Sequence, residues 1–389
     1  MIYRISQFLL LIMMTTGCSW LGSGWFSNSS ESDLSLKFNT IISTVNIQRL
    51  WETKIGSGTG RSFIRLIPVL YNGLIYVSSY DGQIVSIDAI TGHRMWEVNS
   101  KLSISGGVGL SSSGLVLLGT DKGEVLALRQ VDGGEVWRTT VSGEILAPPN
   151  GDREIIVVST SDGKFIGLEA NSGKHLWTST YAIPALSLRG NPSPLLVQNT
   201  VISGLANGKL AVLSLDKGRI LTEKTIDLPH GRTDIERLID IDAEQKVFGD
   251  MLYAVAYQGS IVAINLQSGN QIWKRPISSY SGIDVDANMV YISDDADSIS
   301  ALDRSDGKTL WKQNNLMGRR LTAPASGDGY IVVCDCKGYL HLLNKKDGHV
   351  IGRIRAANKA IITSPIVGNG NTIFVYSRDG TLSAFQVGV

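Results

Sequence analysis

The residue types that most often perform chemistry are few in this chain and lie far apart. Three of the five histidines lie in the same variable region just after a glycine of a repeated segment, which is typical of an exposed turn. These three are His93, His175 and His349, and the other two are His230 and His341. No HExxH, GxSxG or zinc-type cysteine spacing occurs, and the glycine-rich segment 56–60 lacks the lysine of a phosphate-binding loop. The chain is therefore predicted to have no catalytic residues and to bind no metal.

Two cysteines lie close together near the C-terminus, Cys334 and Cys336. Alternate residues of a strand are poorly placed for a disulfide, whose two Cα atoms prefer a separation of about 5.5–6 Å. We therefore expect two free, half-buried thiols.

The composition is balanced in charge. Charged residues make up 18%, aromatic residues 7%, and the formal net charge is +1. Such a chain does not attract nucleic acid or an anionic membrane surface through its overall field. Nucleic acid is therefore not an expected partner.

A repeated segment organises most of the chain. One clear copy is DGKFIGLEANSGKHLWT from Asp162, in which a glycine, an alternating apolar run, a second glycine and a tryptophan follow in order. The leading glycine, or Asp297 in its place, falls at 82, 123, 163, 208, 259, 297, 338 and 380. Repeats of about 40–45 residues with short strands are typical of propeller blades. The sequence predicts an all-β fold, an eight-bladed β-propeller with four antiparallel strands per blade.

Turn residues delimit the strands inside each repeat. Asp81-Gly82 predicts a tight hairpin turn in which both central residues have positive φ. Proline is confined largely to sheet edges, so it is expected next to the innermost strand, which lines a central channel. The proline signals are Ala147-Pro148-Pro149, Ser193-Pro194, Ala323-Pro324 and Ser364-Pro365.

The last repeat is incomplete. Residues 378–389 end before any tryptophan strand, whereas residues 46–56 have the outer-strand pattern, with Trp51 at the tryptophan position. We expect the N-terminal strand to complete the last blade and close the ring, so that the propeller domain spans 46–389. The repeated tryptophans are expected to fill the space between blades; the alternative is a stacking surface for a sugar or cofactor.

The N-terminus has the features of an export signal. Arg4 precedes an apolar run that is too short for a membrane span of about 20 residues, so residues 1–17 read as a signal peptide. The end of this region resembles a bacterial lipobox, which implies lipid attachment at Cys18, a lipidated flexible tether over 18–45 and, with Ser19 next, location on the periplasmic face of the outer membrane. An ordinary signal peptide with an incidental cysteine is the alternative.

The repeats resemble those of the pyrroloquinoline quinone dehydrogenases, which hold a quinone and Ca²⁺ over the channel of an eight-bladed propeller. Those enzymes are longer and commonly have two adjacent cysteines against the quinone. Here Cys334 and Cys336 are separated by a residue, and no acidic cluster suggests a Ca²⁺ cage. A quinone-dependent periplasmic dehydrogenase remains the alternative function.

Three further segments resemble the β-propeller lipoproteins of the outer-membrane β-barrel assembly machinery of Gram-negative bacteria. They are WETKIGSGTG at 51–60, ALSLRGNPSP from Ala185 and ERLIDIDAEQ from Glu236. The resemblance implies a non-enzymatic scaffold lipoprotein without a cofactor. Such a scaffold binds the periplasmic, polypeptide-transport-associated domains of the central barrel subunit and helps outer-membrane proteins to fold and insert.

The same resemblance implies which residues make the contact. They are Leu186, Leu188 and Arg189, together with Asp240 and Asp242. Alternate leucines of an extended segment face one side, and an arginine can form paired hydrogen bonds with a carboxylate. The alternative is that the leucines are core residues and the aspartates are solvated turn acids. A further hypothesis is that exposed blade edges pair with strands of unfolded outer-membrane proteins.

Overall fold

A computed structural model describes residues 43–60, 64–188, 190 and 192–388. The predicted signal peptide, Cys18, most of the tether and Arg189 lie outside the described residues. Contacts divide the chain into the units Met1–Thr40 and Ile41–Val389, and the second contains every described residue. In the described residues, no helix has both the length and the apolar character needed to cross a membrane.

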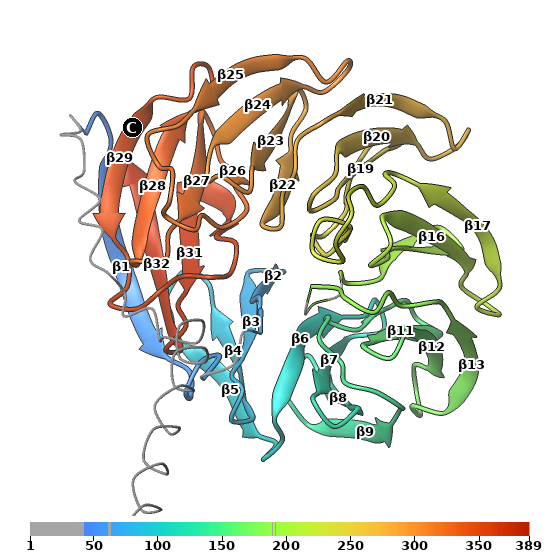
Figure 1. Cartoon of the computed structure of the whole chain (residues 1–389). Helices are drawn as coiled ribbons and strands as arrows, with labels where there is room; N and C mark the ends of the chain where they lie inside the picture. The colour runs from blue at the N-terminus through green and yellow to red at the C-terminus, as the bar shows by residue number, and fades with distance from the viewer. Residues whose placement is uncertain (1–42, 61–63, 189, 191, 389) are drawn as a thin grey trace, which may run out of the picture. The chain divides into compact units, whose positions relative to one another are not determined.

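Eight four-stranded antiparallel sheets form a ring of blades (Figure 1). Blade 1 contains β2 (Val69–Tyr71), β3 (Leu74–Ser78), β4 (Gln83–Asp88) and β5 (Arg94–Asn99). Blade 2 contains β6 (Ile104–Leu110), β7 (Leu115–Thr120), β8 (Glu124–Arg129) and β9 (Glu135–Thr140). Blade 3 contains β10 (Asn150–Gly151), β11 (Ile155–Thr160), β12 (Lys164–Glu169) and β13 (His175–Thr180). Blade 4 contains β14 (Leu195–Val197), β15 (Thr200–Gly204), β16 (Lys209–Ser214) and β17 (Ile220–Thr225).

The second half of the ring repeats this plan. Blade 5 contains β18 (Lys246–Phe248), β19 (Met251–Val255), β20 (Ile261–Asn265) and β21 (Gln271–Arg275). Blade 6 contains β22 (Gly282–Val285), β23 (Met289–Ser293), β24 (Ile299–Asp303) and β25 (Thr309–Gln313). Blade 7 contains β26 (Ala325–Ser326), β27 (Tyr330–Cys334), β28 (Tyr339–Asn344) and β29 (Val350–Arg355). Blade 8 contains β30 (Ile366–Val367), the 3-10 turn η1 (Asn369–Asn371), β31 (Thr372–Tyr376), β32 (Thr381–Gly388) and β1 (Asn46–Lys54). The predicted eight-bladed fold is confirmed.

The N-terminal strand closes the ring as expected. β1 runs antiparallel to β32, from the pair Asn46 and Gly388 to the pair Lys54 and Thr381. The two ends of the propeller therefore share one sheet. Every blade therefore has a neighbouring blade on each side.

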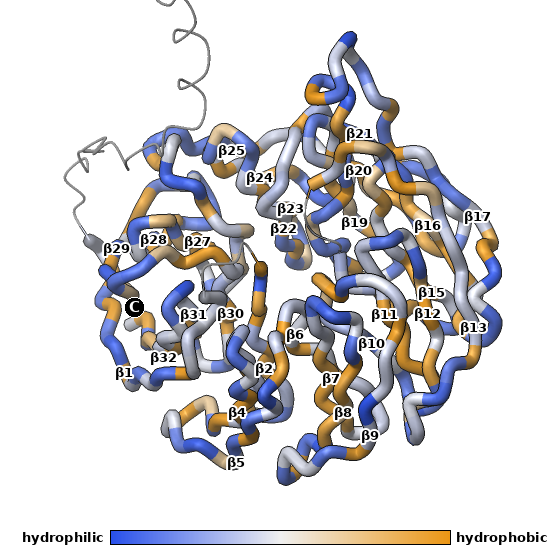
Figure 2. The backbone as a smooth tube through the Cα atoms, turned by 60° about the horizontal axis from the view of Figure 1, so that its bottom comes forward, coloured by the Kyte–Doolittle hydropathy of each residue, from blue (hydrophilic) through white to orange (hydrophobic). Residues whose placement is uncertain are grey.

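The buried core lies between neighbouring blades and is supplied mainly by their middle strands. In blade 1, four consecutive residues are buried in both β3 and β4, whereas β5 buries only Trp96. Figure 2 shows the same trend, with apolar residues concentrated in the middle strands and polar residues towards the rim. A middle strand is covered on both faces, so its sequence is an almost continuous apolar run.

The hairpin between β3 and β4 differs from the prediction. Gly82 has φ of 90°, but Asp81 is not among the residues with positive φ. The Ser79 amide donates to the Gln83 carbonyl and the Gly82 amide to the Ser79 carbonyl, at 2.9 and 3.0 Å. The loop therefore has three residues and ends on a left-handed glycine, a common hairpin form that needs only one positive φ.

The inner strands are short and follow the predicted prolines. β10, β14, β26 and β30 begin directly after or one residue after a proline, and each contains only two or three residues. A residue without an amide hydrogen at that point costs the sheet no ladder hydrogen bond. Three of these prolines, Pro148, Pro324 and Pro365, line a cavity at the axis.

The repeated tryptophans join consecutive blades, which favours the structural interpretation. Each indole Nε1 donates a hydrogen bond to a backbone carbonyl of the next blade, just before that blade's second turn glycine. The pairs are Trp51 with Ala89, Trp96 with Gln130, Trp137 with Ala170, Trp177 with Leu215, Trp273 with Arg304 and Trp311 with Lys345, at 2.7–3.2 Å. Each of these residues therefore both fills the gap between two sheets and fixes their spacing.

Replacing one such tryptophan should weaken the whole ring. We expect Trp137→Ala to lower the free energy of unfolding by about 3–5 kcal/mol, because it opens a cavity between blades 2 and 3 and removes the hydrogen bond to Ala170. Urea unfolding followed by circular dichroism measures this. Val136→Ala, on the same strand but exposed, should change the value by only about 0.5 kcal/mol. Equal losses for the two variants would contradict the proposed role of the indole.

Candidate partner-binding site

Two connections between blades contain the predicted contact residues, and they lie against each other. One links β13 to β14 and the other links β17 to β18. The Leu188 amide donates a hydrogen bond of 3.0 Å to Asp240 Oδ2. Gly190 adjoins Asp242, since a Cβ added at position 190 would stand 2.2 Å from Asp242 Oδ1. Segments more than 50 residues apart in the sequence thus form one surface.

The two aspartates are buried. Ile239 and Ile241 are 3% and 0% exposed and pack into the core, so the alternating residues Asp240 and Asp242 face the other connection. Their exposed fractions are only 3% and 8%. The idea that they are solvated turn acids is therefore wrong. Asp240 accepts a hydrogen bond from the Leu188 amide, and Asp242 packs against Gly190.

The two leucines differ in exposure. Leu186 is 40% exposed, whereas Leu188 is half-buried and lines the axial cavity. Leu186 is therefore one of the exposed apolar side chains of these two connections, together with Ile183, Leu228 and Ile235. Leu188 holds the segment in place through its backbone contact with Asp240.

Sequence reasoning missed one basic residue of this site. Arg65 Nη1 lies 3.7 Å from Asp242 Oδ2, and Arg65 Nη2 donates to the Tyr280 carbonyl at 3.1 Å. Arg65 comes from the connection to blade 1 and Tyr280 from the connection to blade 6. No local sequence motif predicts a contact between connections on different blades, so this contact is found only in the folded structure.

Burial controls the ionisation of the two acids. Burial, together with the nearby Asp242 carboxylate, raises the pKa of Asp240 to about 7, against the hydrogen bonds from the Leu188 and Ile241 amides. Burial also raises the pKa of Asp242, whereas the Arg65 cation opposes that rise. Two carboxyl groups in one buried place resist being charged together.

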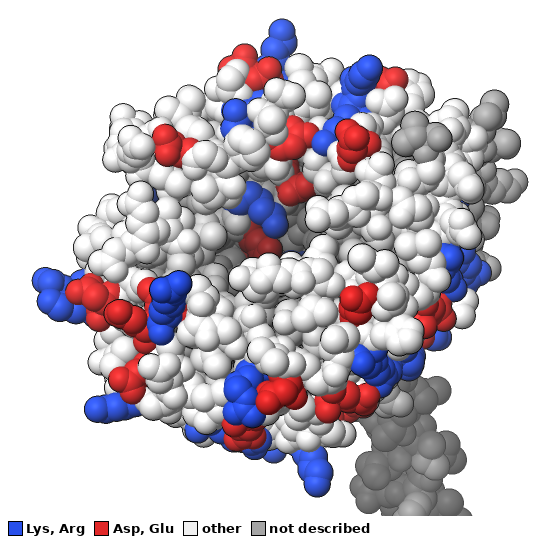
Figure 3. Space-filling model, turned by 180° about the vertical axis from the view of Figure 1, so that it is seen from behind, with Lys and Arg blue, Asp and Glu red and all other residues white. Residues whose placement is uncertain are grey.

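The site borders a cavity of about 720 Å³ at the propeller axis. Leu188, Gly190 and Asp242 line it, together with Arg65. Figure 3 shows the propeller from behind, with basic and acidic side chains inside the central hollow. The connection between β13 and β14 reaches this hollow, where Leu188 and Gly190 contact Asp240 and Asp242. These contacts fix the position of the connection.

The described part of the chain has no cluster of three or more histidine, cysteine, aspartate or glutamate side chains that could hold a metal. Cys334 and Cys336 are free and do not line the axial cavity. Cys334 is fully buried rather than half-buried, because it ends β27 in the core between blades 7 and 8. Burial raises the pKa of both thiols, so neither is an activated thiolate.

Comparisons with known proteins show the family to which the chain belongs. The family model described as "Outer membrane protein assembly factor BamB" matches residues 80–313 and 296–388. The chain is 32% identical to the protein of that name from Yersinia pestis, over 97% of each chain. The crystal structure of BamB from Moraxella catarrhalis superposes with a TM-score of 0.79 at 27% identity, over 88% of this chain and 100% of that one. The chain belongs to the BamB family.

Solved structures of quinone-dependent dehydrogenases, the alternative function, also match this BamB chain. A quinohemoprotein alcohol dehydrogenase from Comamonas testosteroni matches with a TM-score of 0.71 but only 12% identity, over 87% of this chain and 76% of that one. That likeness shows the fold alone. The named BamB relatives are assembly factors, which confirms the prediction that this chain is not an enzyme.

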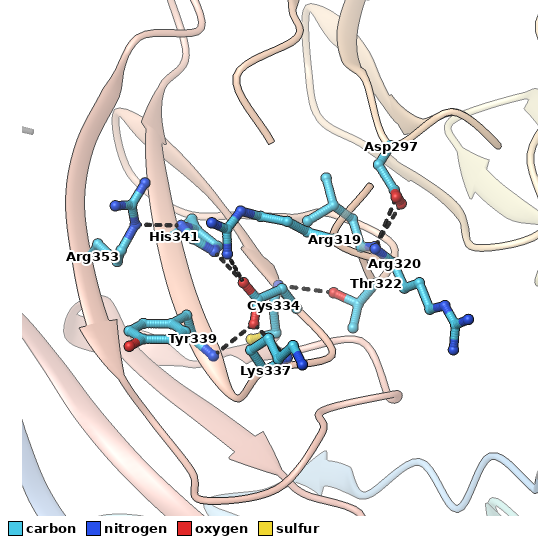
Figure 4. Close-up of polar contacts among 11 residues, drawn as sticks. Asp297, Arg319, Arg320, Thr322, Cys334, Lys337, Tyr339, His341 and Arg353 are labelled. Atoms are coloured by element: carbon cyan, nitrogen blue, oxygen red, sulfur yellow. Dashed lines mark hydrogen bonds and ion pairs between the residues drawn. The ribbon is translucent and has the colours of Figure 1, made fainter. Parts of the chain in front are cut away.

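This BamB chain also contains a buried charged network that sequence reasoning missed, because His341 looked like an isolated histidine (Figure 4). Asp335 Oδ2 accepts a hydrogen bond from Arg319 Nη1 and lies 3.0 Å from each of Arg319 Nη1 and His341 Nε2. Arg353 Nε donates to His341 Nδ1 at 3.0 Å. His341 is therefore neutral, with its proton on Nε2, and the network fastens the connection that enters blade 7.

Burial sets the ionisation of this network. Burial lowers the pKa of His341 and outweighs the Asp335 carboxylate, which favours the charged ring. Burial opposes ionisation of Asp335, but hydrogen bonds and the charge of its partners outweigh it and lower the pKa of that carboxyl. A second proton on His341 would meet the Arg353 donor.

The raised pKa of Asp240 predicts a stability that depends on pH. The folded state holds the Asp240 proton more tightly than the unfolded state does, so this contribution is present below about pH 4 and is lost as pH rises to about 7. Asp240→Asn cannot lose a proton and keeps an acceptor for Leu188. We expect this variant to gain about 2 kcal/mol relative to the natural chain between about pH 5 and about pH 8. Urea unfolding measures the gain, which the exposed control Asp234→Asn should lack.

The lowered pKa of His341 predicts the opposite trend. The unfolded state takes up a proton below about pH 6.5 while the folded state resists it, so stability is lost as pH falls through that range. We expect the Tm of the natural chain to fall more on acidification than that of His341→Gln. The exposed control His349→Gln should keep the natural slope. Identical slopes for all three proteins would contradict the neutral, buried state of His341.

Proposed function

We propose that this chain is a non-enzymatic scaffold of the outer-membrane protein assembly machinery. The observation that supports it most is the contact between Leu188 and Asp240, which joins the two connections whose sequences depart from the blade repeat. Irregular connections on a rigid repeat frame are where binding surfaces are expected. Membership of the BamB family supports the same role.

The proposed partner is the central barrel subunit, bound through its periplasmic, polypeptide-transport-associated domains. Leu186 is exposed and would enter an apolar pocket of that partner. Arg189 would pair with a carboxylate, as arginine does at many interfaces. Asp240 and Asp242 would hold the connection between β13 and β14 in position, since their burial fits that role better than direct contact with the partner.

The proposed location is the periplasmic face of the outer membrane. Acylation at Cys18 would provide the anchor, and several acyl chains would be needed because one chain binds a membrane only marginally. The residues between Cys18 and β1 would then let the propeller reach a partner at some distance from the bilayer.

Strands of unfolded outer-membrane proteins are proposed as a second class of partner. The rim strand of each blade lies at one end of its sheet order, so one of its edges has no neighbouring strand among the described residues. Rim residues such as Met95 and Leu310 are 59% and 48% exposed. An extended chain could add to such an edge through main-chain hydrogen bonds.

The proposed contact with the barrel subunit can be tested at Leu186. Leu186→Glu should weaken binding of the purified periplasmic domains by roughly 30-fold, because it places a charge where an apolar anchor is buried in the complex. Isothermal titration calorimetry measures the Kd, and Arg189→Glu should have a similar effect.

Met95→Glu, at a residue that is also exposed but lies on blade 1, is the control and should bind normally. Unchanged affinity of Leu186→Glu, with an unchanged circular dichroism spectrum and Tm, would contradict the placement of the interface. Loss of binding in both Leu186→Glu and Met95→Glu would mean that the effect is not local.

A further inference from the structure

Six of the eight junctions between blades are closed in one way. The tryptophan of one blade covers the second turn glycine of the next blade, and a Cβ added to that glycine would stand 2.2–2.7 Å from the indole. The residue paired with the tryptophan on the adjacent strand is always small, which leaves room for the ring. These small residues are Ser86, Ala127, Gly167, Ala263, Ala301 and Ala384.

Two junctions lack the tryptophan. Thr222 takes its place in blade 4 and Gly352 in blade 7. The residues paired with them are larger, Val212 and Leu342. The chain therefore treats these two junctions differently from the other six, and each needs another way to cover its apolar surface.

The junction between blades 7 and 8 is filled by the start of β1 and the residues just before it. A Cβ on Gly352 would stand 2.7 Å from Val45 Cγ2 and 3.1 Å from Ile47 Cδ1. The Thr44 amide donates to the Ile351 carbonyl at 2.9 Å. Two alternate apolar side chains and one main-chain hydrogen bond thus replace the tryptophan here.

The junction between blades 4 and 5 is left open by the described residues. Gly269, the turn glycine that a tryptophan would cover, is exposed and has no other described atom within 4 Å of an added Cβ. Val212 is half-exposed, whereas the residues at its position beside a tryptophan are buried. Leu266, whose carbonyl corresponds to the indole acceptors, is half-exposed, and that carbonyl accepts no hydrogen bond from the described part of the chain. We call Val212, Thr222, Leu266 and Gly269 the rim notch.

The contact made by Lys224 does not replace the tryptophan. Lys224 Nζ donates to the Gly269 carbonyl. Arg275 and Gln313 make the same contact with Gly307 and Gly348 at junctions that do contain an indole. This cation therefore borders the rim notch and leaves its floor uncovered, and it adds an attraction for an aromatic ring.

We propose that the rim notch binds a large aromatic side chain, tryptophan best, on an extended segment of a partner protein. The occupant is defined by the molecule itself: six equivalent junctions accept an indole, and a seventh accepts an extended segment. The indole N–H would donate to the Leu266 carbonyl, and a backbone N–H of the segment would donate to the Leu221 carbonyl, the counterpart of Ile351. The proposal does not rest on the contact through residues 186–190 and can fail or hold independently of it.

The first experiment uses the whole protein with labelled leucine and valine methyl groups and N-acetyl-L-tryptophanamide as the probe. Ring-current shifts should appear at the methyl groups of Val212 and Leu266 and saturate with probe concentration. N-acetyl-L-leucinamide should give no such shifts. Absence of saturable shifts at these two residues would overturn the proposal.

Filling the notch from within is the sharpest control. Thr222→Trp should abolish the probe-induced shifts and raise the Tm, whereas Leu221→Trp, on the neighbouring exposed residue, should retain the shifts. Because Val212 is larger than its counterparts, Val212→Ala should tighten probe binding several-fold. If Thr222→Trp alone fails to fold, Val212→Ala combined with Thr222→Trp should fill the site without crowding. Shifts that persist in the filled, folded variant would overturn the proposal.

The opposite change should create a second site. Trp177→Thr opens the junction between blades 3 and 4, so the probe should then also shift the Leu215 methyl groups. For the extended segment, a capped peptide of residues 44–48 with Ile47→Trp should bind roughly tenfold more tightly than the amide probe, since it adds a main-chain hydrogen bond. Equal affinity would overturn the extended-segment part of the proposal.

Discussion

The structure depends on the need to cover both faces of every blade. The middle strands of each sheet carry apolar residues on both faces. A single blade would leave both faces in water, so each blade needs a neighbour on either side. Sharing β1 with the last blade meets this need at the point where the chain would otherwise leave a free face. The sheets diverge towards the rim, and the tryptophans fill that widening space while tying each blade to the next through one hydrogen bond.

A ring built in this way provides a rigid frame on which irregular connections can be displayed. The connection that contains Leu186 rests on buried acids and on an arginine from another part of the ring, so its exposed leucine has a fixed position before any partner arrives. Little ordering entropy is then lost on binding, which favours docking. The same frame has no activated thiol or metal-binding cluster among the described residues.

The sequence predicted the fold because its repeats encode local structure: a glycine at most turns, alternation in the strands and a tryptophan in six of the eight rim strands. It also predicted the ring closure, since Trp51 matched the tryptophans of the other rim strands. It failed where the outcome depends on tertiary context. The exposure of Asp240, the position of Arg65 and the network around His341 arise from contacts between distant segments, and the turn at Asp81 could have been formed in more than one way.

We propose that this propeller acts by docking, through the surface where the connections after blades 3 and 4 meet. An electron cryo-microscopy structure of the whole assembly complex containing this chain tests it most directly. We expect residues 186–190 to lie at the interface with the periplasmic domains of the barrel subunit, with Asp240 and Asp242 behind them. A complex in which that surface faces solvent and the propeller contacts the barrel subunit elsewhere would contradict it.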